Sequence, residues 1–418
     1  MESLKLLLVS PHYKASQGGV SMHIYNLSLS LSKLGHQVSV ITHDILPSGE
    51  LRLLNQEYGI QVYSIPFFQS TPKSVLFGDL EFSLKALKFF QKFRSKIKPD
   101  VIHASQASAF FFAYSKGIKE IREPLVTKLH GLFENYYLSA LRQVLDCRLY
   151  EGTFRSDYIQ VLLSPLNWAR YLLMLHQVLQ HSDRIIVINQ FMKTKLVRTY
   201  KALADKIKVV YNGIDPYELD AVDADYHEYL KRIKNHNKFV LHLGAYGSEK
   251  GTKYLMHAFR RLSSIHRDVK LVIAGYGSDE ELLHLIKVSE ILGIRKNLLL
   301  FRNVPRRFLS TFYRNADVFV NASPMDSLGN VTLEAMYCAR PVVCSRSGGA
   351  PEVIIDNKNG IMFRPFDVKD LSNKIFILIE DEKFGERIGI NARNTILERN
   401  LTWERTAKET VSILKEIS

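Results

Sequence analysis

Two carboxylates and several small polar residues stand close together in residues 321–352. Asp326 lies in a loop of small residues, and Glu334 follows eight residues later inside a helical pattern. A loop that leads into a helix presents backbone N–H groups without intrahelical partners, and such groups bind phosphates and sugar hydroxyls. Carboxylates at this spacing can face the same ligand. The stretch therefore predicts a polar pocket that binds an anion.

A second glycine turn follows in the same stretch. Residues 341–344 are an apolar run typical of a short buried strand. Residues 347–352, Ser-Gly-Gly-Ala-Pro-Glu, then form a turn that is predicted to open another helix. Two such turns side by side would outline one anion-binding pocket.

A cation in a third glycine-bearing turn could hold a diphosphate. Lys250 lies near the end of the turn at residues 244–251, just before a helix predicted over 252–262. A cation beside helix N–H groups can hold a diphosphate without a metal. Asp223-Ala224-Asp225 matches a D-x-D metal signature, but it lies in an acidic connector, and we interpret it as linker charge. The sequence has no H-E-x-x-H motif or Cys/His cluster, so no metal site is predicted.

Strands and helices alternate along the whole chain around these residues. Strands are predicted at 4–9, 37–42, 60–65, 99–103, 125–130, 184–188, 206–210, 239–243, 269–274, 298–301, 317–320 and 341–344. Helices are predicted at 21–34, 80–97, within 135–181, and at 252–262, 279–292, 371–379, 386–397 and from 401. This alternation is typical of doubly wound α/β proteins. Because the pattern restarts after Asn212-Gly213-Ile214-Asp215, we expect two tandem domains with a ligand site in the cleft between them.

The length and composition agree with two ordinary globular domains, but the charge is uneven. The chain has 418 residues, 46% of them hydrophobic and 23% charged, with a net charge of +14. Residues 1–210 contain 26 Lys and Arg against 15 Asp and Glu, which gives +11 and leaves +3 for the remainder. A large anionic partner is therefore expected to meet the first half. On charge alone, nucleic acid, anionic lipid and charged glycan all fit.

One predicted helix concentrates positive charge. Residues 85–98 hold six cations and no acidic residue: Lys85, Lys88, Lys92, Arg94, Lys96 and Lys98. One interpretation is a solvated helix face, with cations favoured at the helix C-terminus. The other is a surface for anionic lipid or an anionic acceptor.

The first half offers two weaker candidates for a ligand site. Gly18 and Gly19 close the loop after the first strand, and His130 ends the strand predicted at 125–130. Doubly wound proteins bind ligands at this edge of the sheet. A plain tight turn and a structural histidine are the alternative interpretations. Neither the first loop nor the turn at Gly244 has a G-x-G-x-x-G motif, which argues against a NAD-dependent oxidoreductase.

Cysteine usage and hydropathy indicate a cytoplasmic protein. The three cysteines form no CxxC pair, which fits a reducing compartment. The first ten residues run directly into a strand, so no signal peptide is predicted. Residues 161–180 are apolar but interrupted by Asn167, Arg170 and His176, which favours a buried or interfacial helix over a membrane span.

Taken in order, the motifs resemble the GT4 family of retaining glycosyltransferases over nearly the full chain. They are GGV, PDVIH, HG at 130–131, NGID, G-x5-KG, GYG, the D-x7-E of DSLGNVTLEAM, PVV and SGGAPEVI. The resemblance implies a GT-B fold, with two tandem Rossmann-like doubly wound domains and an interdomain cleft. It implies an acceptor-binding domain at 1–212 and a nucleotide-sugar domain at 213–398. A C-terminal helix at 399–418 is expected to pack on the first domain.

The resemblance also assigns roles to residues. Glu334 would hold the ribose hydroxyls, and Lys250, with the turn at Gly244, would hold the diphosphate. Backbone N–H groups would contact the sugar and phosphate from Ser327, Leu328, Gly329, Asn330 and Val331. Gly18 and Gly19 would let the first-domain loop approach the diphosphate. His130 and Asp326 would be the catalytic residues at the donor sugar.

The implied function is metal-independent, retaining transfer of a hexose-type sugar to a glycan or lipid-linked acceptor. The donor would be a UDP-, GDP- or dTDP-type nucleotide sugar, with no cofactor and no nucleic acid partner. The protein would be cytoplasmic and peripheral on the inner face of the membrane, where the six cations of residues 85–98 would contact anionic lipid.

The chain departs from the family pattern at three positions, which keeps an alternative open. Ala245 replaces the arginine of G-R-x4-K-G, and Asp326 replaces the first glutamate of E-x7-E. These changes are compatible with a non-catalytic nucleotide-sugar-binding protein or a partner subunit. Ala339 stands where glycine is usual and predicts a different helix ending.

Overall fold

The computed structural model describes residues 3–13, 18–43, 59–66, 72–131, 155–246 and 250–418. They fall into two compact units. The first unit contains the described residues of Met1–Leu132 together with Pro165–Gly213 and Thr402–Ser418. The second unit contains Ile214–Leu401 and the described residues of Phe133–Ser164.

The first unit is built on a parallel sheet of seven described strands. They are β1 (Lys5–Val9), β2 (Gln37–Thr42), β3 (Gln61–Ser64), β4 (Val101–Ser105), β5 (Leu125–Leu129), β6 (Arg184–Val187) and β7 (Ile207–Val209). Their order in the sheet is β3-β2-β1-β4-β5-β6-β7, and every described pair is parallel. The direction of winding reverses between β1 and β4, where doubly wound sheets bind their ligands.

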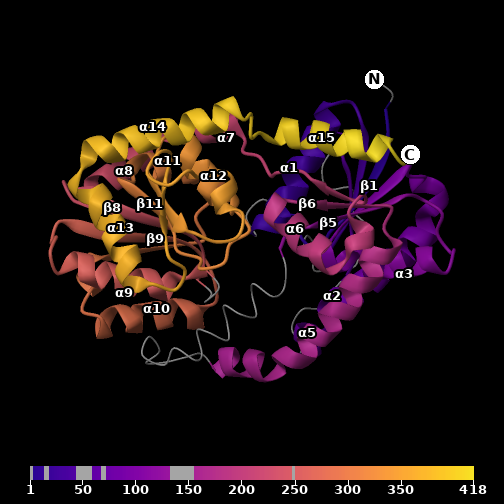
Figure 1. Cartoon of the computed structure of the whole chain (residues 1–418), viewed down its shortest axis with the longest axis horizontal. Helices are drawn as coiled ribbons and strands as arrows, with labels where there is room; N and C mark the ends of the chain where they lie inside the picture. Colours follow the sequence, from indigo (N-terminus) through magenta and orange to yellow (C-terminus); the bar gives the residue numbers. More distant parts are fainter. Residues whose placement is uncertain (1–2, 14–17, 44–58, 67–71, 132–154, 247–249) are drawn as a thin grey trace. The chain divides into compact units, whose positions relative to one another are not determined.

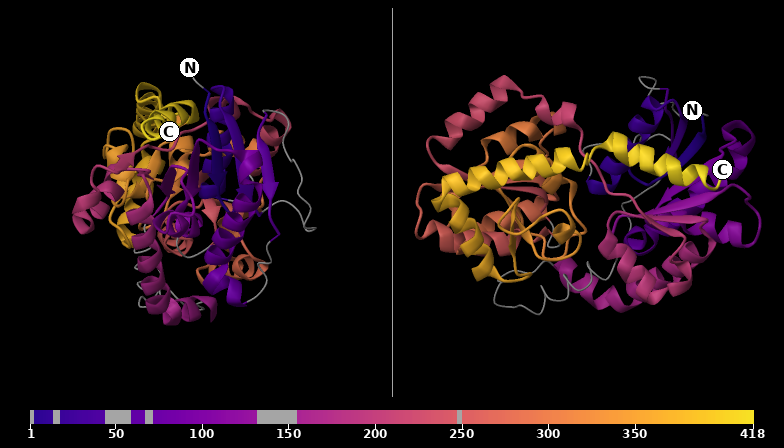
Figure 2. Two further views of the ribbon diagram at one scale, coloured as in Figure 1. Left: turned by 90° about the vertical axis from the view of Figure 1, so that its right-hand side faces the viewer. Right: turned by 45° about the horizontal axis from the view of Figure 1, so that its top comes forward.

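Helices cover both faces of this sheet. The longer ones are α1 (Gly19–Lys33), α2 (Pro72–Ile97), α3 (Phe110–Gly117), α5 (Arg155–His181), α6 (Gln190–Thr199) and α15 (Trp403–Lys415). Because side chains alternate along a strand, Leu6 and Leu8 pack on one face with α1 and α15, while Leu7 and Val9 pack on the other with α2 and α3. Figures 1 and 2 show α15, in yellow, lying along this unit beside α1. The last residues of the chain therefore complete the core of the first unit.

The second unit repeats the architecture. Its described strands are β8 (Lys238–Ala245), β9 (Val269–Tyr276), β10 (Leu298–Arg302), β11 (Val318–Asn321), β12 (Val342–Ser345) and β13 (Ile361–Phe363). They form one parallel sheet in the order β10-β9-β8-β11-β12-β13. The winding direction reverses between β8 and β11. The two tandem doubly wound units predicted from the sequence are thus confirmed.

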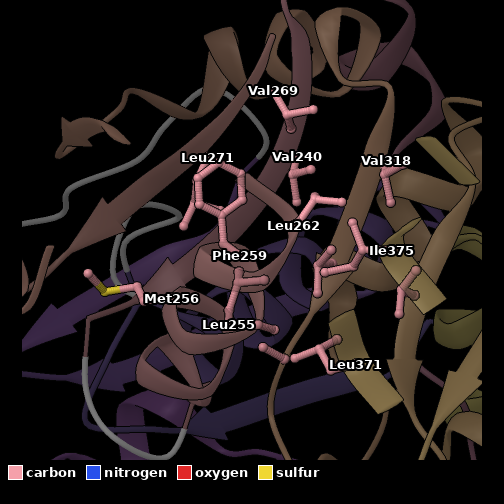
Figure 3. Close-up of a cluster of buried hydrophobic side chains, with 14 of the residues drawn as sticks. Val240, Leu255, Met256, Phe259, Leu262, Val269, Leu271, Val318, Leu371 and Ile375 are labelled. Carbon is pink, nitrogen blue, oxygen red and sulfur yellow. The ribbon is translucent and has the colours of Figure 1, made fainter. Parts of the chain in front are cut away.

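The helices of the second unit pack on this sheet through a continuous apolar core. They are α7 (Pro216–Asp220), α8 (Ala224–Lys234), α9 (Thr252–Ser263), α10 (Asp279–Ile291), α11 (Leu309–Asn315), α12 (Asn330–Tyr337), α13 (Val368–Glu380) and α14 (Glu382–Glu398). Figure 3 shows Phe259 and Leu262 of α9 with Ile375 of α13 among strand residues such as Val240 and Val318. All five are buried.

Three local predictions were wrong. Residues 347–352 open only a short 3-10 turn, Ala350–Glu352. Asp223 is not linker charge, because it caps α8 by accepting a hydrogen bond from the Tyr226 N–H at 2.9 Å. Ala339 takes the left-handed conformation, with φ of 55°, and two backbone hydrogen bonds close a Schellman motif after α12. The helix therefore ends as it would with glycine.

None of the helices in the described part of the chain is long and apolar enough to cross a membrane.

Candidate functional site

The predicted pocket residues of the second unit lie where its sheet reverses direction. Gly244 is one of the last two residues of β8, Lys250 follows that strand, and the loop containing Asp326 follows β11. The two loops touch, because a Cβ on Gly251 would stand 2.1 Å from the carbonyl oxygen of Ala322. Gly251 also has a φ of 69°, which favours glycine. Sequence spacing therefore located these loops at the edge where the sheet reverses direction, which is where doubly wound sheets bind ligands.

The turn after β8 places a lysine over a neutral histidine. A Cβ on Gly244 would lie 3.7 Å from the Lys250 Cγ, an ordinary contact distance, so the lysine stem lies beside this glycine; its φ of 155° is what disfavours other residues. Beneath the turn, His242 is buried with its Nδ1 2.9 Å from the Val320 carbonyl oxygen. Burial, reinforced by Lys250 and opposed by the hydrogen bond to Val320, lowers the pKa of His242 to about 4. Near neutral pH, Lys250 rather than His242 is the cation of this turn.

Asp326 is held in place by one asparagine. The Nδ2 of Asn321 donates to Asp326 Oδ2 at 2.8 Å and to Thr332 Oγ1 at 2.9 Å. Since Asn321 ends β11 and Thr332 lies on α12, this side chain joins strand, loop and helix. A Cβ on Gly329 would stand 2.8 Å from the same carboxylate oxygen, so the loop is closely packed around Asp326.

The second glycine turn lies beside this loop, as predicted. The hydroxyls of Ser345 and Ser347 donate to the Pro324 carbonyl oxygen at 3.0 and 2.7 Å. The Gly349 N–H donates to the Asp326 carbonyl oxygen at 3.3 Å. These hydrogen bonds fix the two turns against each other.

The loop delivers the N-terminus of α12 to the same place. Within the described residues, no side chain caps this helix after Gly329. Leu328 has a φ of 87°, which a leucine adopts only when its surroundings impose it. The first N–H groups of α12, at Asn330 and Val331, have no partner inside the helix. Together with Lys250, this helix end suits a phosphate.

Glu334 is buried on α12, and each of its carboxylate oxygens has a donor. Oε1 accepts from Arg306 Nη2 at 2.9 Å, and Oε2 accepts from the Tyr313 hydroxyl at 2.7 Å. Burial raises the pKa of Tyr313 well above its ordinary value, and Glu334 raises it further, so the phenol stays protonated. Glu334 is therefore held at both oxygens by protein groups.

Arg306 links Glu334 to a second carboxylate. Its Nε donates to Glu218 at 2.8 Å. Burial alone would lower the pKa of Arg306, but Glu334 and Glu218 raise it above its ordinary value. Asp215 positions Glu218 by capping α7, since it accepts from the Glu218 N–H at 3.4 Å. Glu218, Arg306 and Tyr313 were not predicted from the sequence. The NGID motif was the one local signal that pointed to Glu218.

In the first unit, Gly18 and Gly19 differ in whether the structure requires glycine. Gly18 has a φ of 107° at the start of α1, which disfavours any other residue. Gly19 has no described heavy atom within 4 Å of the place a Cβ would take. The plain-turn interpretation therefore accounts for Gly18, and packing against the described residues does not account for Gly19.

His130 is a half-buried neutral histidine just after β5. Its ring lies edge-on to His23, with centroids 4.7 Å apart, and His23 in turn lies 5.4 Å from Trp403 of α15. Burial lowers the pKa of His130 well below its ordinary value, and Lys128 and His103 lower it further. Its Nε2 has no hydrogen-bond partner among the described residues. A neutral imidazole with an unused nitrogen can bind a sugar hydroxyl.

Two of the six cations of residues 85–98 pair with acidic residues that lie outside that stretch. Lys85 Nζ lies 2.7 Å from Glu81, and Arg94 donates to Glu123 at 2.6 and 2.7 Å. The remaining four cations are exposed: Lys88, Lys92, Lys96 and Lys98. The surface that could meet an anion is thus smaller than the sequence indicated.

Two family models match most of the chain. The model described as Glycosyltransferase Family 4 matches residues 17–218, and the model described as Glycosyl transferases group 1 matches residues 229–395. Both matches agree with the two units of the fold.

Relatives that align over most of this chain agree with these matches. The chain is 28% identical to an uncharacterized glycosyltransferase of Methanocaldococcus jannaschii, over 99% of this chain and 98% of that protein. It is 25% identical to the GPI3 subunit of phosphatidylinositol N-acetylglucosaminyltransferase of Saccharomyces cerevisiae, over 96% and 80%. It is 26% identical to a sulfoquinovosyl transferase of Arabidopsis thaliana, over 93% and 69%.

Two solved structures show the same fold at low sequence identity. Sucrose-phosphate synthase from Thermosynechococcus elongatus matches with a TM-score of 0.81 and 18% identity, over 98% of each chain. The Anabaena protein HepE in complex with UDP-glucose matches with a TM-score of 0.71 and 18% identity, over 99% of this chain and 100% of that one.

Proposed function

Because the chain belongs to glycosyltransferase family 4 and has the GT-B fold, we propose that it transfers a hexose-type sugar from a nucleotide sugar with retention of configuration. The acceptor is a glycan or a lipid-linked molecule. The residues that perform the transfer are those that the family resemblance assigned, with Asp326 and His130 acting at the sugar.

One observation carries the donor assignment. Lys250, the N-terminus of α12 and the buried carboxylate Glu334 all lie where the second sheet reverses direction. A diphosphate needs a cation and N–H donors, and a ribose needs acceptors for its hydroxyls. The structurally similar HepE holds UDP-glucose, which supports a nucleotide sugar as the donor.

The proposed reaction uses fixed donors rather than a metal. The bond between the anomeric carbon and the phosphate oxygen breaks, and the N–H groups after Asp326 and the Lys250 ammonium balance the charge of the departing diphosphate. The acceptor hydroxyl attacks the same face, and its proton passes to the leaving phosphate oxygen. Asp326 stabilises the positive charge at the anomeric centre, and neutral His130 hydrogen-bonds the sugar.

A donor-cleavage panel tests this function. The purified protein is incubated with UDP-, GDP- and dTDP-hexoses, with and without EDTA, and released sugar is followed by proton NMR. We expect slow cleavage of one nucleotide class, unaffected by EDTA, with the first product in the anomeric configuration of the donor. Inverted product or loss of activity in EDTA would overturn the mechanism. If no donor is bound or cleaved, the protein is instead non-catalytic or a partner subunit.

We further propose that four exposed lysines, three on α2 and Lys98 just after it, contact an anionic membrane. The name of one relative, a phosphatidylinositol N-acetylglucosaminyltransferase subunit, indicates a lipid acceptor for that protein. Lys88, Lys92, Lys96 and Lys98 are exposed and offer a cationic stripe to lipid headgroups.

Vesicle flotation tests this contact. We expect binding to phosphatidylserine-containing vesicles but not to pure phosphatidylcholine. Changing Lys88, Lys92, Lys96 and Lys98 together to Gln should abolish the binding. A control removes four exposed cations of the second unit, at Lys358, Lys369, Lys383 and Arg387, and should still bind. Equal flotation of both quadruple variants would return α2 to the solvated-face interpretation.

A further inference from the structure

We propose that Arg306 is a positioning residue that, with Tyr313, makes the site select a nucleotide with both ribose hydroxyls over its 2′-deoxy counterpart. The inference rests on the proposed function, because it takes Glu334 as the ribose-binding group. It narrows the donor to ribonucleotide sugars and disfavours dTDP-type donors.

The Glu334 carboxylate can accept more hydrogen bonds than its two protein donors supply. Each carboxylate oxygen can accept about two hydrogen bonds. Arg306 fills one position on Oε1 at 2.9 Å, and Tyr313 fills one on Oε2 at 2.7 Å. One acceptor position therefore remains on each oxygen. Because Glu334 is 2% exposed, little water can fill these positions from the protein surface.

A ribose diol matches this remaining capacity. Its 2′- and 3′-hydroxyls are two donors on adjacent carbons, one for each carboxylate oxygen. A 2′-deoxyribose brings only one donor and leaves a buried carboxylate position unpaired. Sites built to hydrogen-bond a substrate hydroxyl strongly reject analogues that lack it. Arg306 and Tyr313 thus create the preference, because together they leave only two acceptor positions on Glu334, one for each ribose hydroxyl.

Arg306 is suited to this role by its planar fork. Its Nη2 reaches Glu334 while its Nε reaches Glu218 at 2.8 Å, so the guanidinium is fixed at two ends. Its side chain is only 14% exposed. A lysine carries the charge but offers one ammonium, which cannot reproduce two contacts in one plane. Arg306 therefore fixes both the direction and the charge environment of Glu334.

The surrounding groups make this arginine necessary. Burial raises the pKa of Glu218, while Glu334 and Asp215 raise it further and Arg306 opposes the shift. Cys338 lies close to Glu334, but burial raises its pKa to about 12, so the thiol is neutral. Without Arg306, Tyr313 alone holds the Glu334 carboxylate, so its orientation toward the ribose is no longer fixed at both oxygens.

Titration calorimetry with UDP, GDP and their 2′-deoxy forms tests the inference. The variants are Arg306→Lys, Arg306→Gln and Tyr313→Phe. The control is Arg364→Gln, an exposed arginine of the same unit that pairs with Asp367 and Asp370. We expect the wild type and the control to prefer the ribose form by about tenfold or more, and the three variants to reduce that preference to about threefold or less.

The ratio separates positioning from general damage, because a merely destabilised protein would lose affinity for both forms equally. Equal binding of the two forms by the wild type would overturn the inference, as would an unchanged ratio in the variants. If the wild type binds no nucleoside diphosphate, the proposed function itself fails. Melting temperatures identify any variant that does not fold, and Tyr313→Phe, which removes one hydroxyl, then carries the comparison.

Discussion

Gly348 lies so close to Asp326 that a Cβ on the glycine would stand 1.7 Å from the aspartate carbonyl oxygen. The neighbouring Gly349 N–H donates to that same oxygen at 3.3 Å. The second glycine turn therefore supports the backbone of the loop that carries a proposed catalytic carboxylate. The contact also explains the glycine, since Gly348 has a φ of 59° and no space for a side chain.

Replacing Gly348 with Ala should displace the Asp326 loop. We expect kcat/KM for donor cleavage to fall by about tenfold or more, because small misplacements of a reacting group are costly. Gly293→Ala is the matched control: Gly293 also has a positive φ, of 68°, but no described heavy atom within 4 Å of its Cβ position. Both variants should lose some melting temperature from backbone strain. Equal activity in the two would show that the close contact has no role.

Lys250 should act on the diphosphate and not on the nucleoside. Replacing it with Met is expected to weaken nucleoside diphosphate binding by about ten- to a hundredfold, the size of a lost charge-assisted contact. Binding of the nucleoside without phosphates should not change. Calorimetry on both ligands measures this, with Lys358→Met, at an exposed position, as the control. An equal loss for both ligands would remove Lys250 from the phosphate site.

His130 should affect turnover more than binding. Its imidazole is neutral, and its Nε2 has no hydrogen-bond partner among the described residues. We therefore expect it to act through a hydrogen bond to the reacting sugar. We expect His130→Asn to lower kcat by about a hundredfold with little change in KM. His266→Asn, which breaks a contact with Glu380 in the second unit, is the control. A large rise in KM with unchanged kcat would assign His130 to ground-state binding.

Lys128 should make the stability of the protein depend on pH. Burial lowers its pKa from 10.5 to about 7 in the folded protein. Between these two values the folded state holds fewer protons than the unfolded state, so the free energy of unfolding rises with pH, by up to about 1.4 kcal/mol per unit. Below about pH 7 both states are protonated and this contribution is flat.

Urea unfolding between pH 7 and 9 measures the effect. The variant Lys128→Met keeps the apolar stem and removes the titrating group, so its unfolding free energy should rise less with pH than that of the wild type. Lys358→Met, on the surface, should keep the wild-type slope. Parallel slopes for all three proteins would mean that Lys128 does not titrate in this range.

Much of the fold could be predicted because each sheet is made of local apolar runs. The strand predicted at residues 37–42 is found as β2, and other strand ends moved by a residue or two. Helix α2 begins eight residues before its predicted start, at Pro72 instead of residue 80. Helix α8 was missed because its acidic N-cap, Asp223, resembles a polar connector until the Tyr226 N–H is seen to point at it.

The candidate site was likewise predictable only where its residues lie beside local sequence signals. Asp326, Lys250 and Glu334 stand beside glycine turns and could be identified from local spacing. The partners of Glu334 could not, because Arg306 lies 28 residues before it and Glu218 lies 88 residues before Arg306, with no shared motif. The burial of Lys128 could not be predicted for the same reason. In the sequence it is one of many cations in the basic first half, and only the folded sheet shows that it is buried.

The most direct test of the donor site compares nucleoside diphosphate binding by the wild type and by Glu334→Gln. The substitution keeps the shape but turns one acceptor oxygen into a donor group. We predict that calorimetry will show at least about a tenfold loss of affinity for the preferred nucleoside diphosphate. Glu280→Gln, on the surface of the same unit, should bind like the wild type. Equal affinity in wild type and Glu334→Gln would contradict the assignment of this pocket to the donor.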